Sequence, residues 1–312
     1  MPSTHPPTKP MPPRHPADRP GRLQIGVVGC GRVGSVLGAA LARAGHRIVA
    51  VTAVSPESTR RAAQLLPGVP IRPVDEVVES GDLVLLCIPD DALPGLVEGL
   101  AGAGRWRTGQ LVAHVSGARG LAVLDPATRA GILPLALHPV LPFSGRGPDD
   151  LDRLTGASFG VTAPDPLRLV AEALVVEMGG EPVWVAEELR PLWHAALTIG
   201  ANHLTTLVNS AADLLRLAGV AEPDKVLGPL LGAALDGALR LGDRALTGPV
   251  SRGDAATVAV HLAALTQQAP EAVPAYVAMA RQTADRALAC GRLRPEEAEA
   301  LLDVLAGPRA PA

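Results

Sequence analysis

The chain has 312 residues, of which 47% are hydrophobic, 19% charged and 2% aromatic, and its formal net charge is −3. This length allows two domains, and the apolar content is enough for most of the chain to fold around aliphatic cores. The weak negative charge and the lack of a basic stripe argue against a nucleic-acid partner. No apolar run reaches the roughly 18 residues that a membrane span needs.

We expect three parts along the chain. Residues 1–21 hold eight prolines and no apolar cluster, which predicts a disordered tail. Residues 22–187 alternate strands and helices, which predicts an α/β Rossmann domain with a doubly wound, mostly parallel sheet. Residues 188–312 contain helical patterns alone, which predicts an all-α domain for substrate binding and dimerisation. The strands are expected at 23–28, 46–54, 81–89, 110–117, 132–139, 157–163 and 181–186.

The segment "GCGRVG" directly follows the first predicted strand and opens a helix. Gly29, Gly31 and Gly34 form G-x-G-x-x-G, in which the glycines permit a tight turn, close approach of a pyrophosphate and close helix–strand packing. The loop is therefore expected to bind a dinucleotide, and the alternative is a glycine-rich turn without a ligand. The intervening residues Cys30, Arg32 and Val33 are included in the predicted site.

The end of the second strand predicts which dinucleotide is bound. An acidic residue at this place usually binds the ribose 2′-hydroxyl of NAD, but the segment "AVTAVSPESTRR" has no acid at Val54 or Ser55. Ser55 and Arg60, helped by Ser58 and Arg61, favour the 2′-phosphate of NADP instead. The alternative is that the two arginines belong to a solvated helix face.

Further polar or contact residues stand where predicted strands end. Carboxyl ends of parallel strands line the ligand crevice of such a fold, which makes Ile88 and Pro89 candidates for contact with the cofactor. His114, Ser116 and His138 end two other strands. Any one of them could be structural, but three at one sheet edge favour a site.

A polar stripe follows on the first long helix of the second half. Its members are four or three residues apart, a spacing that predicts a single helix face: His194, Thr198, Asn202, Thr205 and Asn209. The stripe lacks Lys, Arg and Glu, which an exposed face usually carries, so it is expected to line a cleft.

These segments together resemble the Rossmann-like proteins that carry the helical domain of unknown function 2520. The segments are "GVVGCGRVGSVLGAALARAGH", "LLCIPDDAL", "HVSGARG", "LHPVLPFSG", "HAALTIGANHLTTLVNSAADLL" and "LTGPVSRGDAATVAVHL", and the resemblance runs from about residue 23 to 306. This family is similar in layout to ketopantoate reductases, pyrroline-5-carboxylate reductases and β-hydroxyacid dehydrogenases. The resemblance implies NADP(H) binding and, in some members, reduction of ketopantoate for pantothenate synthesis.

One departure from the better-known relatives concerns the catalytic lysine that precedes an asparagine on this helix. Asn202 is present, but Thr198 stands at the matching position, and Lys9 and Lys225 are the two lysines of the chain. His194, one turn earlier, is the expected substitute, because imidazole can donate a proton near neutral pH.

The leading hypothesis is an NADPH-dependent reductase of a small 2-oxo acid, with ketopantoate as the best single substrate. His194 or His138 would donate the proton, Ser116 and Asn202 would orient the carbonyl, and Thr198 would contact the substrate. One alternative is a cyclic imine reductase, whose protonated substrate depends less on an acid. The other is a protein that binds NADP without catalysis.

The segment "GPVSRGD" interrupts the helical half. Gly248 and Pro249 are expected to end one helix, and Asp254 to cap the next. Arg252 has two possible uses: it holds the substrate carboxylate, or it pairs with Asp243 or Asp254.

The remaining expectations concern the setting of the protein. Three widely separated cysteines show no metal-type spacing, which predicts free thiols in the cytoplasm. The Ala- and Leu-rich helices after residue 224 are expected to form a homodimer.

Overall fold

The computed structural model describes residues 21–306, so the predicted proline-rich tail lies outside the described residues except for its last glycine. The chain forms two compact units, which divide between Ala201 and Asn202. We call them the first and the second unit.

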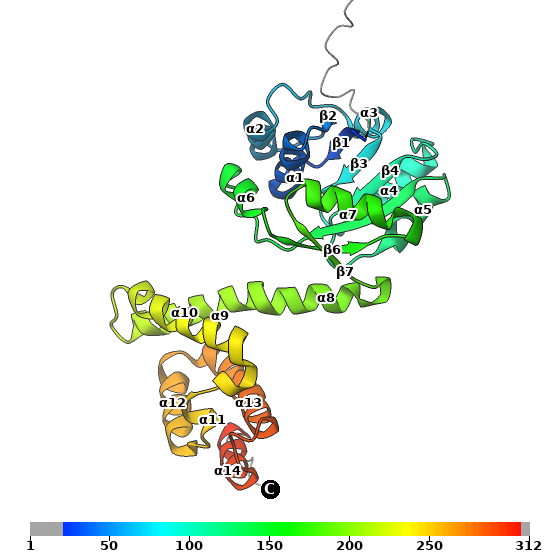
Figure 1. Ribbon diagram of the computed structural model, residues 1–312. Coiled ribbons are helices and arrows are strands. Elements are labelled where there is room, and N and C mark those ends of the chain that lie inside the picture. The colour runs from blue at the N-terminus through cyan, green and yellow to red at the C-terminus, as the bar shows by residue number, and fades with distance from the viewer. Residues whose placement is uncertain (1–20, 307–312) are drawn as a thin grey trace, which may run out of the picture. The chain divides into compact units, whose positions relative to one another are not determined.

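The first unit is built on a sheet of seven strands in the order β2-β1-β3-β4-β5-β6-β7 (Figure 1). All seven predicted strands are present, and every neighbouring pair is parallel except β5 and β6. The predicted doubly wound, mostly parallel sheet is therefore confirmed. The strands are β1 Gln24–Val28, β2 Arg47–Val51, β3 Leu83–Leu86, β4 Leu111–His114, β5 Leu133–Pro139, β6 Ser158–Thr162 and β7 Glu181–Trp184.

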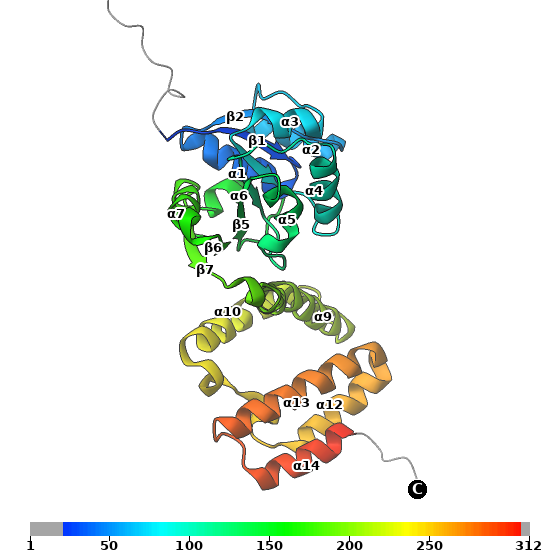
Figure 2. The ribbon, with the colours of Figure 1, turned by 90° about the vertical axis from the view of Figure 1, so that its right-hand side faces the viewer.

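Helices cover both faces of this sheet, as Figure 2 shows from the side. Leu83 and Leu85 pack into the core on one face, whereas Val84 and Leu86 pack into the core on the other, because successive strand residues point to opposite sides. The helices are α1 Arg32–Arg43, α2 Pro56–Leu65, α3 Val74–Ser80, α4 Leu93–Gly102, α5 Asp125–Thr128, α6 Pro148–Arg153, α7 Arg168–Glu177 and α8 Arg190–Leu197.

The second unit is all helical, as predicted. A small core around Val258, Ala284 and Leu301 joins its last three long helices. Its helices are α9 Leu204–Leu217, α10 Pro223–Leu241, α11 Gly248–Ser251, α12 Ala255–Gln268, α13 Val273–Ala289 and α14 Pro295–Ala306. Among residues 21–306, no helix is both long and apolar enough to cross a membrane.

The two units divide later than residue 187, where the change from strands to helices placed the boundary. Helix α8 belongs to the first unit, because Arg190 in its first turn is fully buried and bonds to β6 and to the segment after β4. A π-helix at Thr198–His203 then links α8 to α9. It interrupts the uniform α-helical spacing on which the single polar face was predicted.

The segment "GPVSRGD" differs in part from its prediction. Helix α10 ends at Leu241, and Gly248 and Pro249 begin the short helix α11 instead of ending a long one. Proline fits there because the N–H groups of a first helical turn have no intrahelical partner. The predicted cap is confirmed: Asp254 accepts from the Thr257 N–H at 3.0 Å and starts α12.

Candidate functional site

The loop between β1 and α1 has a backbone that requires glycine at two places and leaves open space at a third. Gly29 has φ of 94°, and a Cβ there would lie 2.4 Å from the Cys87 carbonyl oxygen. A Cβ on Gly34 would lie 2.2 Å from the Gly29 carbonyl oxygen, whereas one on Gly31 would meet nothing within 4 Å. Gly31 is the N-cap of α1, whose first N–H groups face this space. The loop therefore fits the diphosphate of a dinucleotide.

The other residues predicted around the cofactor divide into buried and exposed ones. Cys30 is fully buried and Val33 packs against the core, so both side chains build the loop. A methyl group of Ile88 lies beside the glycine loop, as expected for the end of β3. Arg32 and Pro89 are exposed and leave their side chains accessible.

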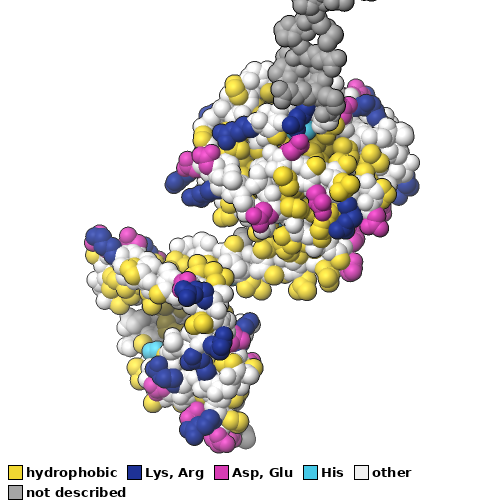
Figure 3. Space-filling model, in the orientation of Figure 1, with side chains coloured by type: hydrophobic (Ala, Val, Ile, Leu, Met, Phe, Trp, Pro, Cys, Tyr) yellow, Lys and Arg dark blue, Asp and Glu magenta, His cyan; other side chains and the backbone are white. Residues whose placement is uncertain are grey.

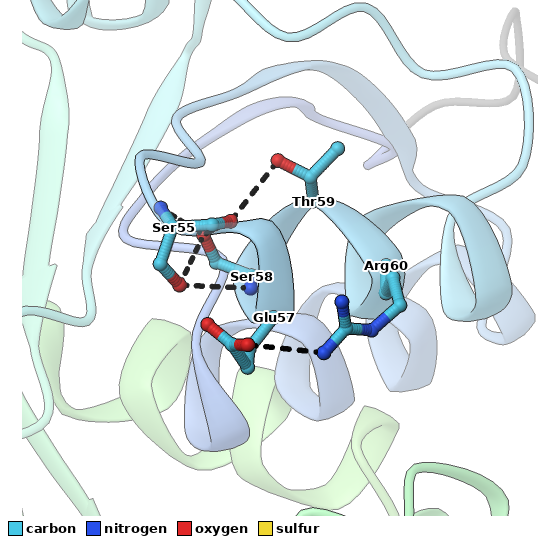
Figure 4. Close-up of polar contacts among 5 residues, drawn as sticks. All are labelled: Ser55, Glu57, Ser58, Thr59 and Arg60. Carbon is cyan, nitrogen blue, oxygen red and sulfur yellow. Dashed lines mark hydrogen bonds and ion pairs between the residues drawn. The ribbon is translucent and has the colours of Figure 1, made fainter.

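The segment after β2 holds the residues predicted to bind the 2′-phosphate of the NADP ribose (Figure 4). Ser55 caps α2: its Oγ accepts from the Ser58 N–H at 3.1 Å, and Ser58 Oγ donates to the Ser55 carbonyl oxygen at 2.8 Å. Arg60 donates to the Glu57 carboxylate at 3.1 Å on the surface, where such a pair is weak. Arg61 is half-buried and has no hydrogen bond or ion pair within residues 21–306.

The charge of Arg61 also reaches the glycine loop. Burial raises the pKa of the Cys30 thiol to about 11, and the Arg61 guanidinium acts in the opposite direction. Arg61, the neighbour of the predicted Arg60, is therefore a cation without a hydrogen bond or ion pair within residues 21–306 whose charge acts on this loop.

The residues after β4 form a closed hydrogen-bond network. Ser116 N–H donates to His114 Nδ1 at 3.2 Å, so the proton of this imidazole is on Nε2, which donates to the Gly120 carbonyl oxygen at 2.9 Å. Ser116 Oγ donates to Asp90 Oδ2 at 2.7 Å and accepts from the Arg119 N–H. The Ser116 hydroxyl group thus donates its hydrogen bond to Asp90 and not to a ligand.

Arg190 is a buried cation behind this network. Its side chain is fully buried, and it donates to the Ser116 carbonyl oxygen at 2.6 Å and to Thr162 Oγ1 at 2.9 Å. Burial lowers the pKa of Arg190 to about 10, and the nearby charges of Glu187 and Asp90 oppose that shift. Its Nε has no acceptor in the described part of the chain.

Two imidazoles meet at the carboxyl end of β5. Trp193 Nε1 donates to His138 Nδ1 at 3.2 Å, and the rings of His138 and His194 lie edge to face with centroids 5.7 Å apart. Burial, together with the charges of His194 and Arg190, lowers the pKa of His138 to about 4. Within residues 21–306, His138 Nε2 and both ring nitrogens of His194 lack hydrogen-bond partners. Both imidazoles therefore keep ring nitrogens for a ligand.

The remaining predicted residues are spread over both units. Thr198 is half-buried at the start of the π-helix, and Asn202 is exposed within it. Arg252 is exposed in the second unit, where Asp243 pairs with Arg286 instead. The Arg252 side chain has no hydrogen bond or ion pair among the described residues, so the predicted pairing with Asp243 or Asp254 is not formed.

Four residues of the site were missed by sequence reasoning: Asp90, Arg119, Trp193 and Arg190. Asp90 and Arg119 stand in "CIPDD" and "HVSGARG", two strand-end segments already considered. Trp193 and Arg190 carry no local signal, since their role depends on packing between α8 and the sheet. Within residues 21–306, no three His, Cys, Asp or Glu side chains gather as a metal site would require.

Residues 9–139 match the Rossmann-like domain family, which is the class of protein that the sheet and the glycine loop define. Residues 157–283 match the domain of unknown function DUF2520. The chain therefore belongs to the Rossmann-like proteins that carry DUF2520, and the resemblance inferred from the sequence is confirmed. No curated protein matches the chain.

Three solved structures show the same fold. A candidate NADP oxidoreductase from Bacteroides fragilis is 23% identical with a TM-score of 0.72, over 85% of this chain and 98% of that one. An imine reductase from Pseudomonas sp. is 19% identical with a TM-score of 0.63, over 91% and 100%. Plasmodium falciparum pyrroline carboxylate reductase, with NADP bound, is 10% identical with a TM-score of 0.55, over 89% and 98%.

Proposed function

We propose that this protein is an NADPH-dependent reductase of a small 2-oxo acid, and that ketopantoate, reduced to pantoate in pantothenate synthesis, is its substrate. One observation carries the proposal: two imidazoles with unpartnered ring nitrogens stand at the sheet edge that also holds the glycine loop. The parallel strands β1, β3, β4 and β5 all end at this edge. A cofactor and a reacting group bound there would be neighbours.

The residues proposed to hold NADP(H) are those of the glycine loop, Ile88, and the segment after β2. The α1 N-terminus would bind the diphosphate, and Ser55 with Arg61 or Arg60 would bind the 2′-phosphate. The solved NADP complex of the Plasmodium protein has the same fold, which supports this choice of cofactor. When bound, NADPH supplies the hydride for the carbonyl carbon.

The chain's own residues have to supply a proton to the carbonyl oxygen. We assign this proton to His194, because the lowered pKa of His138 keeps that ring neutral at pH 7. His138 then binds the oxygen as a hydrogen-bond donor. Asn202 and Thr198 remain the proposed orienting and contact residues.

The substrate carboxylate needs a cation, and two arginines are candidates. Arg252 is the residue predicted from the sequence, and its side chain forms no hydrogen bond or ion pair among the described residues. Arg119 lies in the first unit, where its Nε donates to the Asp90 carbonyl oxygen at 2.8 Å and its terminal nitrogens have no partner within residues 21–306.

The function is tested by NADPH oxidation with purified full-length protein. Ketopantoate and other 2-oxo acids are expected to be reduced, and 1-pyrroline-5-carboxylate much more slowly. Faster turnover of the cyclic imine would support the alternative of an imine reductase, which the missing lysine also fits. Tight NADPH binding without turnover across the whole panel would support a non-catalytic NADP-binding protein.

The cofactor site is tested by a matched pair of glycine variants. Gly31→Ala is expected to fold normally, because its Cβ meets no atom, but to weaken NADPH binding at least about tenfold by occupying the space for the diphosphate. Gly99→Ala, whose Cβ also meets nothing within 4 Å, is the control. Titrations of intrinsic fluorescence with NADPH and with NADH measure the affinities of both variants. If Gly31→Ala bound NADPH as tightly as Gly99→Ala does, the assignment of the loop would be contradicted.

The homodimer remains a proposal that the second unit supports. Many of its large apolar side chains are exposed, and Figure 3 shows hydrophobic side chains on the face in view. Leu230 and Leu239 of α10 are among the exposed ones, at 61% and 79%. A second copy that covers this helix would remove that surface from water. The molar mass in solution, measured by light scattering, tests this assembly.

A further inference from the structure

We infer that His138 binds the substrate through a fixed Nε2–H group, and that this donor makes the site select a ketone oxygen over a protonated imine. The inference rests on the proposed function, because it specifies which functional group that site accepts. It is carried by Trp193, which decides where the proton of His138 resides.

The contact between Trp193 and His138 determines a single tautomer. An indole Nε1–H can donate a hydrogen bond but cannot accept one. Because it lies 3.2 Å from His138 Nδ1, this nitrogen must be the acceptor. In the neutral ring the proton is then on Nε2, which has no partner within residues 21–306.

The position of Trp193 is built into the sheet. Gly160 of β6 stands opposite His138 of β5 in the antiparallel register. A Cβ on Gly160 would lie 2.8 Å from the indole Nε1 of Trp193, so the missing side chain leaves the space that the indole occupies. The indole therefore has one place beside the imidazole.

The imidazoles of His138 and His194 both pack closely against Gly117, which follows β4 and has no side chain. A Cβ on Gly117 would lie 2.8 Å from His138 Nε2 and 2.5 Å from His194 Cδ2. Both imidazoles thus approach the same backbone position at the end of β4. We place the carbonyl oxygen beside these two rings, which the missing side chain of Gly117 allows to lie together.

The charges around His138 favour the neutral ring. The groups that act on it are His194 and Arg190 of α8, His114 of β4 and Asp90 after β3. The first three oppose a proton on His138 and Asp90 favours one, but burial is the largest influence. The ring therefore acts at neutral pH as a hydrogen-bond donor with a single exchangeable proton.

A neutral Nε2–H group distinguishes two classes of substrate. A ketone oxygen has lone pairs and accepts the hydrogen bond, which strengthens as negative charge develops on the oxygen. A protonated imine has no lone pair on nitrogen and offers nothing to this donor. A site built around a buried donor rejects ligands that leave it unpaired.

The tautomer is measured directly by NMR of the full chain labelled with ¹⁵N-histidine, with His138→Gln to assign the resonance. The parent at pH 7 is expected to show His138 as the Nε2–H tautomer, and Trp193→Phe a mixture of tautomers. Trp184→Phe, which removes the indole bond to Glu172 Oε1, is the matched control and should match the parent. A Nδ1–H tautomer or a doubly protonated His138 in the parent would overturn the inference.

Selectivity is measured on the same resonance, with NADP⁺ present. Ketopantoate is expected to shift His138 Nε2, whereas an N-methylated cyclic iminium, which has no lone pair at any pH, should leave it unchanged. The reverse pattern overturns the inference. Where the protein turns over both ketone and imine, Trp193→Phe should narrow the ratio of their kcat/KM values at least about tenfold. Absence of turnover would sink the proposed function alone, since the tautomer and the ligand shifts are read without it.

Discussion

His194→Ala is expected to lower kcat for the ketone about 10²–10⁴-fold, the usual contribution of a positioned general acid. The variant should fold and bind NADPH like the parent. His194 is half-buried and its ring nitrogens have no hydrogen bonds within residues 21–306, so its removal leaves no partner unsatisfied. Steady-state kinetics with saturating NADPH measure the effect.

The control for this variant is His203→Ala, an exposed histidine of the π-helix, for which no loss is expected. Full activity of His194→Ala would show that another group supplies the proton.

The free energy of unfolding is expected to fall by about 3 kcal/mol as the pH drops from 6.5 to 4, through His114 alone. Burial lowers the pKa of His114 from 6.5 to about 4. Between these values the unfolded chain binds the proton and the folded chain does not, so acid favours unfolding. Below pH 4 both states are protonated, so the loss of stability through His114 is complete and does not grow further.

Urea unfolding at pH 7.0 and 5.0 measures this dependence. The difference in free energy between the two pH values should shrink in His114→Gln, whatever the absolute stability of that variant. His203→Gln is the exposed control and should keep the parental difference, as should any variant remote from the buried rings. Parallel pH dependences for the parent and His114→Gln would contradict the assigned shift. His138 adds to the parental dependence with the same sign, because its pKa is lowered too.

The fold could be predicted where the relevant signal is local. Each strand of the sheet is a short apolar run, and the glycines at 29 and 34 stand where a Cβ would collide with backbone. The caps Ser55 and Asp254 also act within a few residues. Such features depend on one turn or one strand, which the sequence displays directly.

The remaining features depend on packing between distant segments. The sequence places Ser116 at a strand end but gives no sign that Asp90 accepts a hydrogen bond from its hydroxyl group. Arg190 resembles any helix arginine until β6 and the segment after β4 surround it. The π-helix between α8 and α9 was missed because its residues suit an α-helix equally well.

Positions 160 and 193 depend on each other, because the indole of Trp193 fills the space that Gly160 leaves. A larger residue at 160 expels the indole. A smaller aromatic residue at 193 leaves a void and removes the donor to His138 Nδ1, so the tautomer of that ring is no longer fixed. Each change is expected to be harmful, because the first removes the room for the indole and the second removes the donor to His138 Nδ1. A sheet glycine with no chemistry of its own therefore limits which substitutions the neighbouring helix can accept during evolution.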